Sequence, residues 1–415
     1  RIVGIRIELL NSNDEVVLAT NEITQAKDYF RFDGDQIGKA SFSNTASTTA
    51  VINDSSNTQT LTEVSDLDTL NYLFSKVRVI RTSNDGDHVR CRELQMFINN
   101  DNKLAGNNTF STVSTDSLNR IRNEILGNFA ASYSQNFSIG DNCGVNCNAY
   151  FSKYDIQSIV FYNDTTSSVR IDSIGVRIEL LNTNDNIRVS STEISSGEEF
   201  YRFDGPRIGD ATLSSSFSTT AVINDSSNTE SLTEVADLGT LDYLFSKMRV
   251  FRTDNAGDKI RIKELQLFID GENKASNTKS ELSYINTAGE STSPNDITQI
   301  NDNNVLASDT NFVSTSSAIG VNTGINFNSY YSKYDIEAIV YYNADDTGEI
   351  DDVVGLRIEL LNTNDNVRVS STEISSGKLY YRFDGDRIGD ATLSSSASTI
   401  DVIDDSSNTE SLTGL

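Results

Sequence analysis

The chain repeats itself, and this repetition constrains its fold more than any other feature. Residues 174–233 align without a gap with residues 354–413 and are identical to them at 49 of the 60 positions. A further copy opens the chain at an offset of 171 residues, so that Tyr72 corresponds to Tyr243. Such periods are too long for one turn of a solenoid, whose repeats have about 20 to 45 residues. Each period is therefore expected to be a whole domain with its own core, and about three domains suit a chain of this length.

We place the domain boundaries before two recurring strands, "VRVIRT" and "KMRVFRT". Residues 1–76 then hold the C-terminal part of a first repeat and a connector rich in Ser, Thr and Asn, residues 77–246 hold a second repeat with its connector, and residues 247–415 hold a third with a truncated connector. A boundary between "ELQLF" and "ENKASN" is the alternative. The connectors recur almost verbatim, which favours ordered structure because a flexible tether needs only composition. The last copy stops where the earlier one runs on into "EVADLG", so we expect a segment of a longer array.

Alternation with a period of two predicts strands within each unit. In "VGIRIELL", Ile5, Ile7 and Leu9 fall on one face and Arg6 and Glu8 on the other. The phrase continues into "NTNDN" in the later copies, which predicts a hairpin turn; half of a calcium loop is the alternative, but the Gly and the distal Glu of such a loop are missing. "DIQSIVFYN" and "DIEAIVYYN" are more continuously apolar, which is typical of a central strand covered on both faces.

Turn and helix signals complete the predicted fold. The strands "RVFRT" and "IRIKELQLF" flank "DNAGD" at 254–258, which predicts a hairpin. One short helix per unit is predicted, at "STDSLNRIRNEIL" and at "SPNDITQI". Many short strands with turn signals about every ten residues predict an all-β fold of tandem antiparallel β-sandwich domains.

Charge and hydropathy exclude several classes of partner. Sixty Asp and Glu residues against 33 Lys and Arg residues give a formal net charge of −27, which repels nucleic acid and anionic lipid. The longest apolar runs fall short of the roughly 18 residues that span a bilayer, and the first residues lack the zones of a signal peptide. We therefore expect a soluble chain with no nucleic-acid partner and no membrane insertion, and any export signal would lie outside it.

Catalytic and redox groups are scarce. The only His is His88, and its counterpart in the next unit is Lys259, so a repeated Ser/His/Asp or Cys/His set is excluded and we expect no enzyme. Carboxylate pairs for glycoside hydrolysis stay open, because the acids offer many pairings. Cys91, Cys143 and Cys147 have no counterparts in the other copies. We interpret them as unpaired thiols, with a Cys143–Cys147 bridge or a metal site as the alternatives.

Four stretches of the unit follow one another in an order known from another family. These are "RVFRT…GDKIRIKELQLF" at 249–268, "SPNDITQINDNN" at 293–304, "SYYSKYDIEAIVYYN" at 329–343 and "VVGLRIELLNTNDNVRVSS" at 353–371. Together they resemble the discoidin, or coagulation factor 5/8 type C, family of galactose-binding-like jelly rolls, over about two thirds of each period. The chain departs from that family in having no Trp and in carrying Ser-Lys-Tyr at 332–334 in place of Asp-Leu-Gly.

The resemblance implies a cation site, because many lectin-like members hold Ca²⁺ with an Asp/Asn loop and a Glu on the closing strand. The matching positions are Glu264, Asp302 and Asn304. Their oxygens suit Ca²⁺, a hard cation that takes six to eight such ligands. The alternative is a solvated turn. No cofactor beyond this Ca²⁺ is expected.

Glycan binding would require aromatic faces for stacking and Arg or carboxylate groups for the sugar hydroxyls. One recurring strand end offers this combination in two units. The candidate residues are Tyr201, Arg202 and Asp204, and Tyr381, Arg382 and Asp384. The alternative is an exposed strand face held by cross-strand pairs.

The resemblance is strongest to divergent members that occur in tandem in structural proteins of large viruses and phages and in microbial surface proteins. We therefore predict a non-catalytic structural repeat protein that forms a rod-like fibre, spike or surface array on a virion or microbial cell, at an extracellular location. Its expected partners are copies of itself or neighbouring structural proteins. The alternative is a multivalent, calcium-dependent, carbohydrate-binding adhesin whose partner is a cell-surface glycan. A third reading makes the segment a spacer for an enzyme or receptor-binding tip.

Overall fold

The structure, a computed structural model, is built almost entirely of β-strands. It describes residues 3–20, 22–23, 31–33, 58–60, 67–84, 87–111, 118–122, 132–133, 138–164, 166–207, 229–231, 238–255, 258–276, 282–289, 297–305, 312–344, 349–387 and 409–413. Within these ranges the helices are short 3-10 turns, which confirms the predicted all-β class. No helix there has the length and apolar character needed to cross a membrane. We call residues 3–60 unit 1, residues 67–231 unit 2 and residues 238–413 unit 3.

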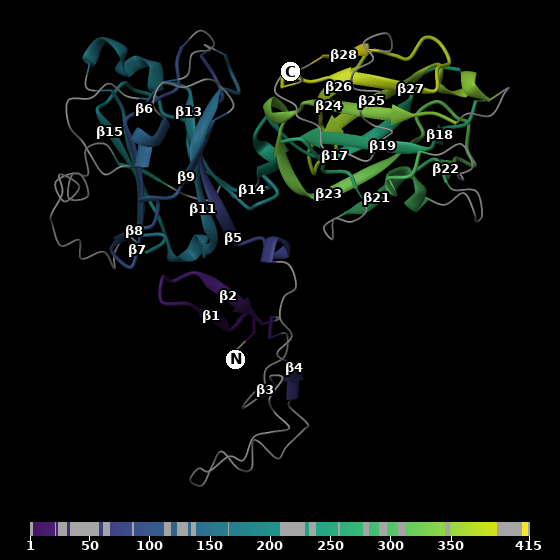
Figure 1. Cartoon of the computed structure of the whole chain (residues 1–415). Helices are drawn as coiled ribbons and strands as arrows, with labels where there is room; N and C mark the ends of the chain where they lie inside the picture. The colour runs from purple at the N-terminus through teal and green to yellow at the C-terminus, as the bar shows by residue number, and fades with distance from the viewer. Residues whose placement is uncertain are drawn as a thin grey trace.

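Unit 2 contains two five-stranded sheets, ordered β14-β13-β5-β11-β9 and β16-β15-β12-β7-β8 (Figure 1). All pairs within these sheets are antiparallel except β15 with β16. The elements are η3 (Leu67–Thr69), β5 (Leu73–Arg81), β6 (Arg90–Cys91), β7 (Glu93–Ile98), β8 (Asp101–Asn102), β9 (Asn108–Ser111), η4 (Leu118–Arg122), β10 (Ser132–Tyr133), β11 (Asn142–Ser152), η5 (Lys153–Asp155), β12 (Ser158–Tyr162), η6 (Ser167–Ser173), β13 (Val176–Leu181), β14 (Ile187–Ser190), β15 (Phe200–Asp204) and β16 (Thr229–Ser231).

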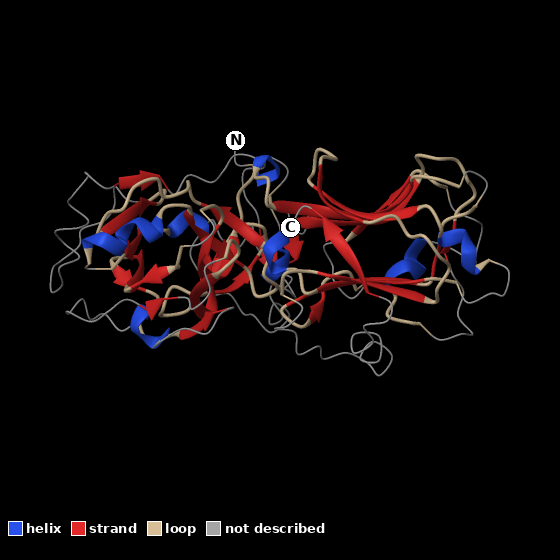
Figure 2. Cartoon of the chain, turned by 90° about the horizontal axis from the view of Figure 1, so that it is seen from above, coloured by secondary structure: helices blue, strands red, loops and turns tan. Residues whose placement is uncertain are grey.

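Unit 3 repeats this plan, and Figure 2 shows its two layers of strands. The two layers are joined into one ten-stranded sheet, because β28 pairs with β27 of one layer and with β26 of the other. The elements are η8 (Leu238–Thr240), β17 (Leu244–Arg252), β18 (Arg261–Ile262), β19 (Glu264–Ile269), β20 (Glu272–Asn273), β21 (Ser283–Asn286), η9 (Ile297–Asn301), β22 (Phe312–Val313), β23 (Asn322–Ser332), η10 (Lys333–Asp335), β24 (Ala338–Tyr342), η11 (Ile350–Val353), β25 (Leu356–Leu361), β26 (Val367–Ser371), β27 (Tyr380–Asp384) and β28 (Thr409–Thr413).

Unit 1 is described only in part. Its strands are β1 (Glu8–Leu10), β2 (Val16–Ala19), β3 (Arg31–Asp33) and β4 (Thr58–Thr60). The β1–β2 hairpin corresponds to β13–β14 of unit 2, and the parallel β3–β4 pair corresponds to β15–β16.

The recurring phrase forms the same hairpin in every unit, as predicted. Each copy pairs its two strands antiparallel, with a register shift at the second Leu. In unit 2 the side-chain oxygen of Asn182 accepts hydrogen bonds from the backbone N–H groups of Asn184 (3.1 Å) and Asn186 (2.8 Å). Asp185 takes the left-handed conformation, with φ of 63°. The turn satisfies its own backbone groups in this way and therefore needs no cation.

One local prediction was wrong. "DNAGD" does not close a hairpin, because β17 pairs with β23 and β25 whereas β19 pairs with β20 and β24. The segment instead crosses from one layer to the other, since the alternating pattern fixes which face of a strand is buried but not the sheet that the strand joins. The short helices predicted within 114–126 and 293–300 are present in the described residues as the 3-10 segments η4 and η9.

The predicted boundaries before Val77 and Lys247 fall inside strands β5 and β17. The units begin earlier, at η3 and η8, because the turn-rich stretch before each of these strands packs with the strand that follows. Most of the predicted Ser/Thr/Asn connectors, at 208–228 and 388–408, lie outside the described residues.

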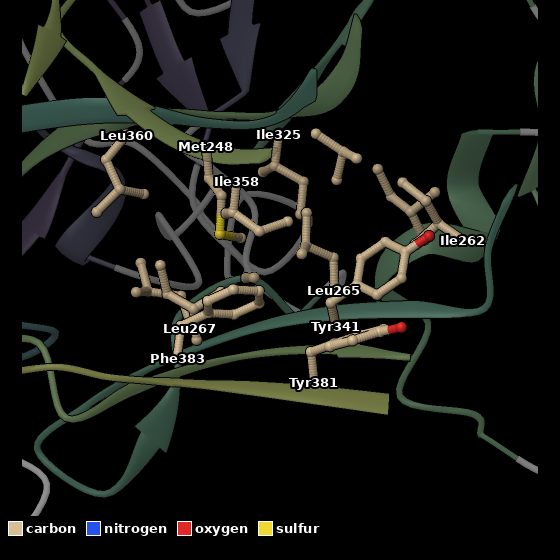
Figure 3. Packing of buried hydrophobic residues seen from close by; sticks show 14 of the residues in the cluster. Met248, Ile262, Leu265, Leu267, Ile325, Tyr341, Ile358, Leu360, Tyr381 and Phe383 are labelled. Atoms are coloured by element: carbon tan, nitrogen blue, oxygen red, sulfur yellow. The ribbon is translucent and has the colours of Figure 1, made fainter. Parts of the chain in front are cut away.

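Each sandwich has its own core between its two layers. Figure 3 shows the core of unit 3, where side chains from opposite layers meet. One layer contributes Met248, Ile325, Ile358 and Leu360, and the other contributes Leu265, Leu267, Tyr341, Tyr381 and Phe383. Burying each large side chain stabilises the fold by about 1.5–3 kcal/mol. The central strands β12 and β24 are buried at all five positions, as their continuous apolar sequences predicted.

Candidate functional site

A separate cluster of apolar residues lies outside these cores, where unit 2 meets unit 3. We call this contact junction 2. The outer face of the β14-β13-β5 part of the first sheet packs against one end of unit 3, which we call its near end. Unit 2 contributes Ile80, Leu181 and Ile187, and unit 3 contributes Tyr243, Leu244 and Tyr334. In Figure 1 β14 accordingly lies beside the strands of unit 3.

A buried arginine joins the two units electrostatically. Arg78 donates hydrogen bonds to Glu179 from Nε (2.9 Å) and Nη2 (2.6 Å), and its Nη1 donates to Asp335 of unit 3 (2.6 Å). The three side chains are at most 8% exposed. Burial by itself lowers the pKa of Arg78, but the charges of Asp335 and Glu179 raise it on balance. Tyr243 of unit 3 donates to the second oxygen of Glu179 (2.9 Å). The network therefore fixes how the near end sits on the sheet.

A second charged cluster lies at the hairpin turn of unit 2. Asp185 accepts hydrogen bonds from Lys76 of its own unit (2.5 Å) and from Lys274 of unit 3 (3.4 Å). Burial raises the pKa of Asp185, but the two ammonium groups lower it on balance. The side chain of Lys274 is only 1% exposed, and a buried ammonium group requires such carboxylate partners.

A glycine allows unit 3 to approach closely. A Cβ atom at Gly140 would lie 2.6 Å from Cβ of Tyr334, so a larger residue at this position would collide with the near end. Arg387 of unit 3 also donates to the carbonyl oxygen of Gly140. The backbone of unit 2 is therefore in direct contact with unit 3 at this point.

The same contact occurs one unit earlier, between the β1–β2 hairpin and unit 2, and we call it junction 1. Its apolar cluster contains Val16 of unit 1 with Leu70, Tyr72 and Leu73 of unit 2, the counterparts of Ile187, Leu241, Tyr243 and Leu244.

The polar contacts of junction 1 also have counterparts in junction 2. Lys103 pairs with Asp14 at 3.0 Å, as Lys274 pairs with Asp185. The guanidinium of Arg6 lies 5.7 Å from the ring centre of Tyr72, and the corresponding distance in junction 2 is 5.8 Å. Consecutive junctions therefore use corresponding residues.

The predicted sugar-binding residues are brought together in each unit, but their rings are not available for stacking. Tyr201 and Tyr381 are buried in the cores of units 2 and 3. The Tyr201 hydroxyl donates to the carbonyl oxygen of Ser196, and Tyr381 does the same with Ser376. Arg202 and Arg382 each pair with the Asp two residues later, Asp204 and Asp384, at 2.6 Å.

Two of the predicted calcium ligands lie close together. Glu264 is buried, and it accepts a hydrogen bond from the backbone N–H of Asn303 (3.2 Å). Burial, followed by the charge of Asp302, raises the pKa of Glu264 to about 9, so this carboxyl group is neutral at pH 7. The third residue, Asn304, donates its backbone N–H to Asp302 (2.9 Å). Within the described ranges, no three His, Cys, Asp or Glu residues are grouped so that they could hold a metal ion.

The three cysteines are free and buried, which agrees with the interpretation of unpaired thiols. Burial raises the pKa of Cys147 to about 12 and that of Cys91 well above its ordinary value. Cys91 and Cys147 are therefore poorly reactive.

No family model, curated protein or solved structure matches this chain. The resemblance to the discoidin family, and with it the jelly-roll topology, therefore stays a prediction.

The junction residues were not among the predicted site residues. A signal for them is present in the sequence, because the strand positions that point away from the core carry the same charged residues in successive copies, such as Glu8, Glu179 and Glu359. The same alternation is also typical of a strand with one solvated face, so by itself it does not identify a buried contact.

Proposed function

We propose that the chain is a non-catalytic structural repeat protein whose stacked units form a fibre, spike or surface array on a virion or microbial cell. The observation that carries this proposal is the recurrence of one junction. Lys103–Asp14 and Lys274–Asp185 are corresponding ion pairs in two successive contacts. A chain that joins its units by the same contact transmits position and force from one unit to the next.

The geometry of the junction supports an extended assembly. Each contact joins the end of one unit to the sheet face of the unit before it, so the two surfaces are different and complementary. Heterologous contacts of this kind generate rings when the rotation closes and helical filaments when it does not. We therefore expect the predicted rod-like assembly to be a curved or helical stack. The buried charges at Arg78 and Asp185 select the register of stacking, because a shifted unit would leave them unpaired.

The alternative function, a multivalent carbohydrate-binding adhesin, has no comparable observation among the residues that the structure describes. A glycan array separates the two functions. Binding that EDTA abolishes would favour the adhesin, and regular polymers in electron micrographs without glycan binding would favour the scaffold.

A spin-label distance measurement tests the structural proposal directly. Ile171 of unit 2 and Leu379 of unit 3 are more than half exposed, so the double variant Ile171→Cys, Leu379→Cys carries one label on each unit. The native cysteines are buried and take up little label. We expect a single narrow distance distribution that is insensitive to salt, because buried ion pairs are weakly screened. A broad distribution would mean that the units tumble independently and would refute the proposal.

A further inference from the structure

Unit 3 carries the same outer sheet face that unit 2 uses in junction 2. We call this surface the open face. It is formed by β17, β25, β26 and the turn before β23. Its residues are Lys247, Arg249, Phe251, Gly320, Glu359, Asp365 and Val367, the counterparts of Lys76, Arg78, Ile80, Gly140, Glu179, Asp185 and Ile187.

The open face is uncovered where its counterpart in unit 2 is buried. Val367 is 45% exposed, whereas Ile187 is 2% exposed. The Asp365 side chain is 68% exposed, whereas that of Asp185 is 10% exposed. A Cβ atom at Gly320 would meet nothing within 4 Å. Apolar and charged groups that one unit buries are thus left accessible in the next.

The polar part of the open face already has the geometry of junction 2. Arg249 donates to Glu359 from Nε (2.8 Å) and Nη2 (2.6 Å), as Arg78 does to Glu179. Lys247 pairs with Asp365 at 2.6 Å. What junction 2 adds is a set of groups from the near end, namely a carboxylate for the arginine, an ammonium group for the aspartate and a tyrosine on the glycine. A complementary partner must bring these three groups.

We propose that the open face binds the near end of a further sandwich unit in the same chain order, with the residues that unit 3 presents to unit 2. This proposal rests on the stacked array proposed above. The near end supplies Tyr334, Lys274 and Asp335, which match the glycine, the aspartate and the arginine of the open face one for one. It also supplies Tyr243, which matches the glutamate. A second copy of the chain offers no complete near end within the described residues. Unit 2 covers the near end of unit 3, and unit 1 already occupies the part of the near end of unit 2 that holds Tyr72 and Lys103, although Tyr154 there is 54% exposed. We therefore take the occupant to be a unit joined through a connector, as unit 3 is joined to unit 2.

An extended chain tests this. The extended chain consists of residues 1–413 followed directly by a second copy of residues 234–415. Thr413 is then followed by the same Glu that follows Thr233 in the natural order. Val367→Cys, made only in the original unit 3 and not in the added copy, reports whether the open face is covered. Ile187→Cys is the matched control, and it reports whether junction 2 is closed. Maleimide labelling rates are compared between the 415-residue chain and the extended chain. The chain without either substitution gives the background of the buried native thiols.

We expect Cys at 367 to react at least about tenfold more slowly in the extended chain, because a covered thiol reacts only from the opened fraction of the junction. A Gly320→Ala substitution should restore fast labelling in the extended chain and leave labelling of the 415-residue chain unchanged. Equal rates at 367 in both chains, with 187 protected, would overturn the inference and leave the stacked array intact. Fast labelling at 187 would instead refute the array itself. Protection at 367 that appears in the 415-residue chain as its concentration rises would identify a second copy as the occupant and overturn the inference.

Discussion

Units 2 and 3 present almost the same strand sequences on their outer sheet faces, yet unit 2 buries this face and unit 3 exposes it. All four residues of β14 are buried, whereas β26 begins with an exposed residue and is only partly buried at alternate positions beyond it. The sequences differ there only by Ile187 in place of Val367. The difference teaches that burial in a repeat is decided by the neighbouring unit as well as by the unit's own core.

The comparison also explains why charged residues recur on this face. Buried ion pairs contribute little net stability, because desolvation offsets most of their attraction. Removing one member is costly, however, since the other is left buried without a partner. The charges of the face therefore tolerate exposure in unit 3 and specify the correct partner in unit 2.

The largest difference in stability between the two faces is expected when Arg78→Met is compared with Arg249→Met. In unit 2 the substitution leaves Glu179 and Asp335 buried without a cation, which should destabilise junction 2 by about 3–5 kcal/mol. In unit 3 the substitution leaves only Glu359 without its cation, at a site where the arginine side chain is 20% exposed, and a smaller cost of about 1–3 kcal/mol is expected. Hydrogen-exchange mass spectrometry of β14 and β26 measures both. Equal losses of protection would show that the two faces are energetically alike and would break the comparison.

The architecture within a unit was largely accessible from the sequence, because alternation reports which residues face a core. It identified the β1, β13 and β25 strands, their hairpin turns and the fully buried central strands. It could not identify the sheet that a strand joins, and the "DNAGD" arch was therefore mistaken for a hairpin. Pairing between distant strands depends on packing across the whole core, and a local pattern holds no record of it.

The junctions were less accessible, for a related reason. Arg78 and Glu179 alternate with core residues, and this is also the pattern of a strand with one solvated face. Only the contact with Asp335, which is 257 residues from Arg78 in the sequence, distinguishes a buried ion pair from a surface one. The predicted sugar-binding site shows the reverse error, because Tyr201 looks exposed by its polar neighbours but faces the core.

A smaller effect is expected for Gly140→Ala and its matched control, Gly320→Ala. Both glycines are left-handed, with φ of 92° and 93°, so both substitutions carry the same backbone strain of about 1–2 kcal/mol. Only Gly140 also meets Tyr334, and the collision should add about 1–3 kcal/mol. The spin-label distance distribution between units 2 and 3 should broaden for Gly140→Ala alone. If both variants broaden it equally, backbone strain and not the contact controls the junction.

The smallest expected effect separates the two junctions by pH. Asp270 lies beside Asp185 in junction 2, whereas its counterpart in junction 1 is Asn99 beside Asp14. Burial, followed by the charge of Asp185, raises the pKa of Asp270 to about 7 from its ordinary value of 3.8. Asp335 acts in the same direction, and Lys76 opposes it.

Because the stacked state holds this proton more tightly, the proton favours stacking fully below about pH 4, and its contribution is lost as the pH rises through about 7. Asp270→Asn should therefore strengthen junction 2 at pH 8 and leave it nearly unchanged at pH 4, whereas Asn99→Asp should give junction 1 the same dependence. Hydrogen exchange of β14 and β2 across this pH range measures the two effects. They should be small because the attraction of Asp270 to Lys76 and Lys274 offsets part of its repulsion from Asp185. If Asp270→Asn instead weakens junction 2 at pH 8, the carboxylate of Asp270 stabilises the junction there, most directly by attracting Lys274. The electrostatic difference between the two junctions would then have the opposite sign.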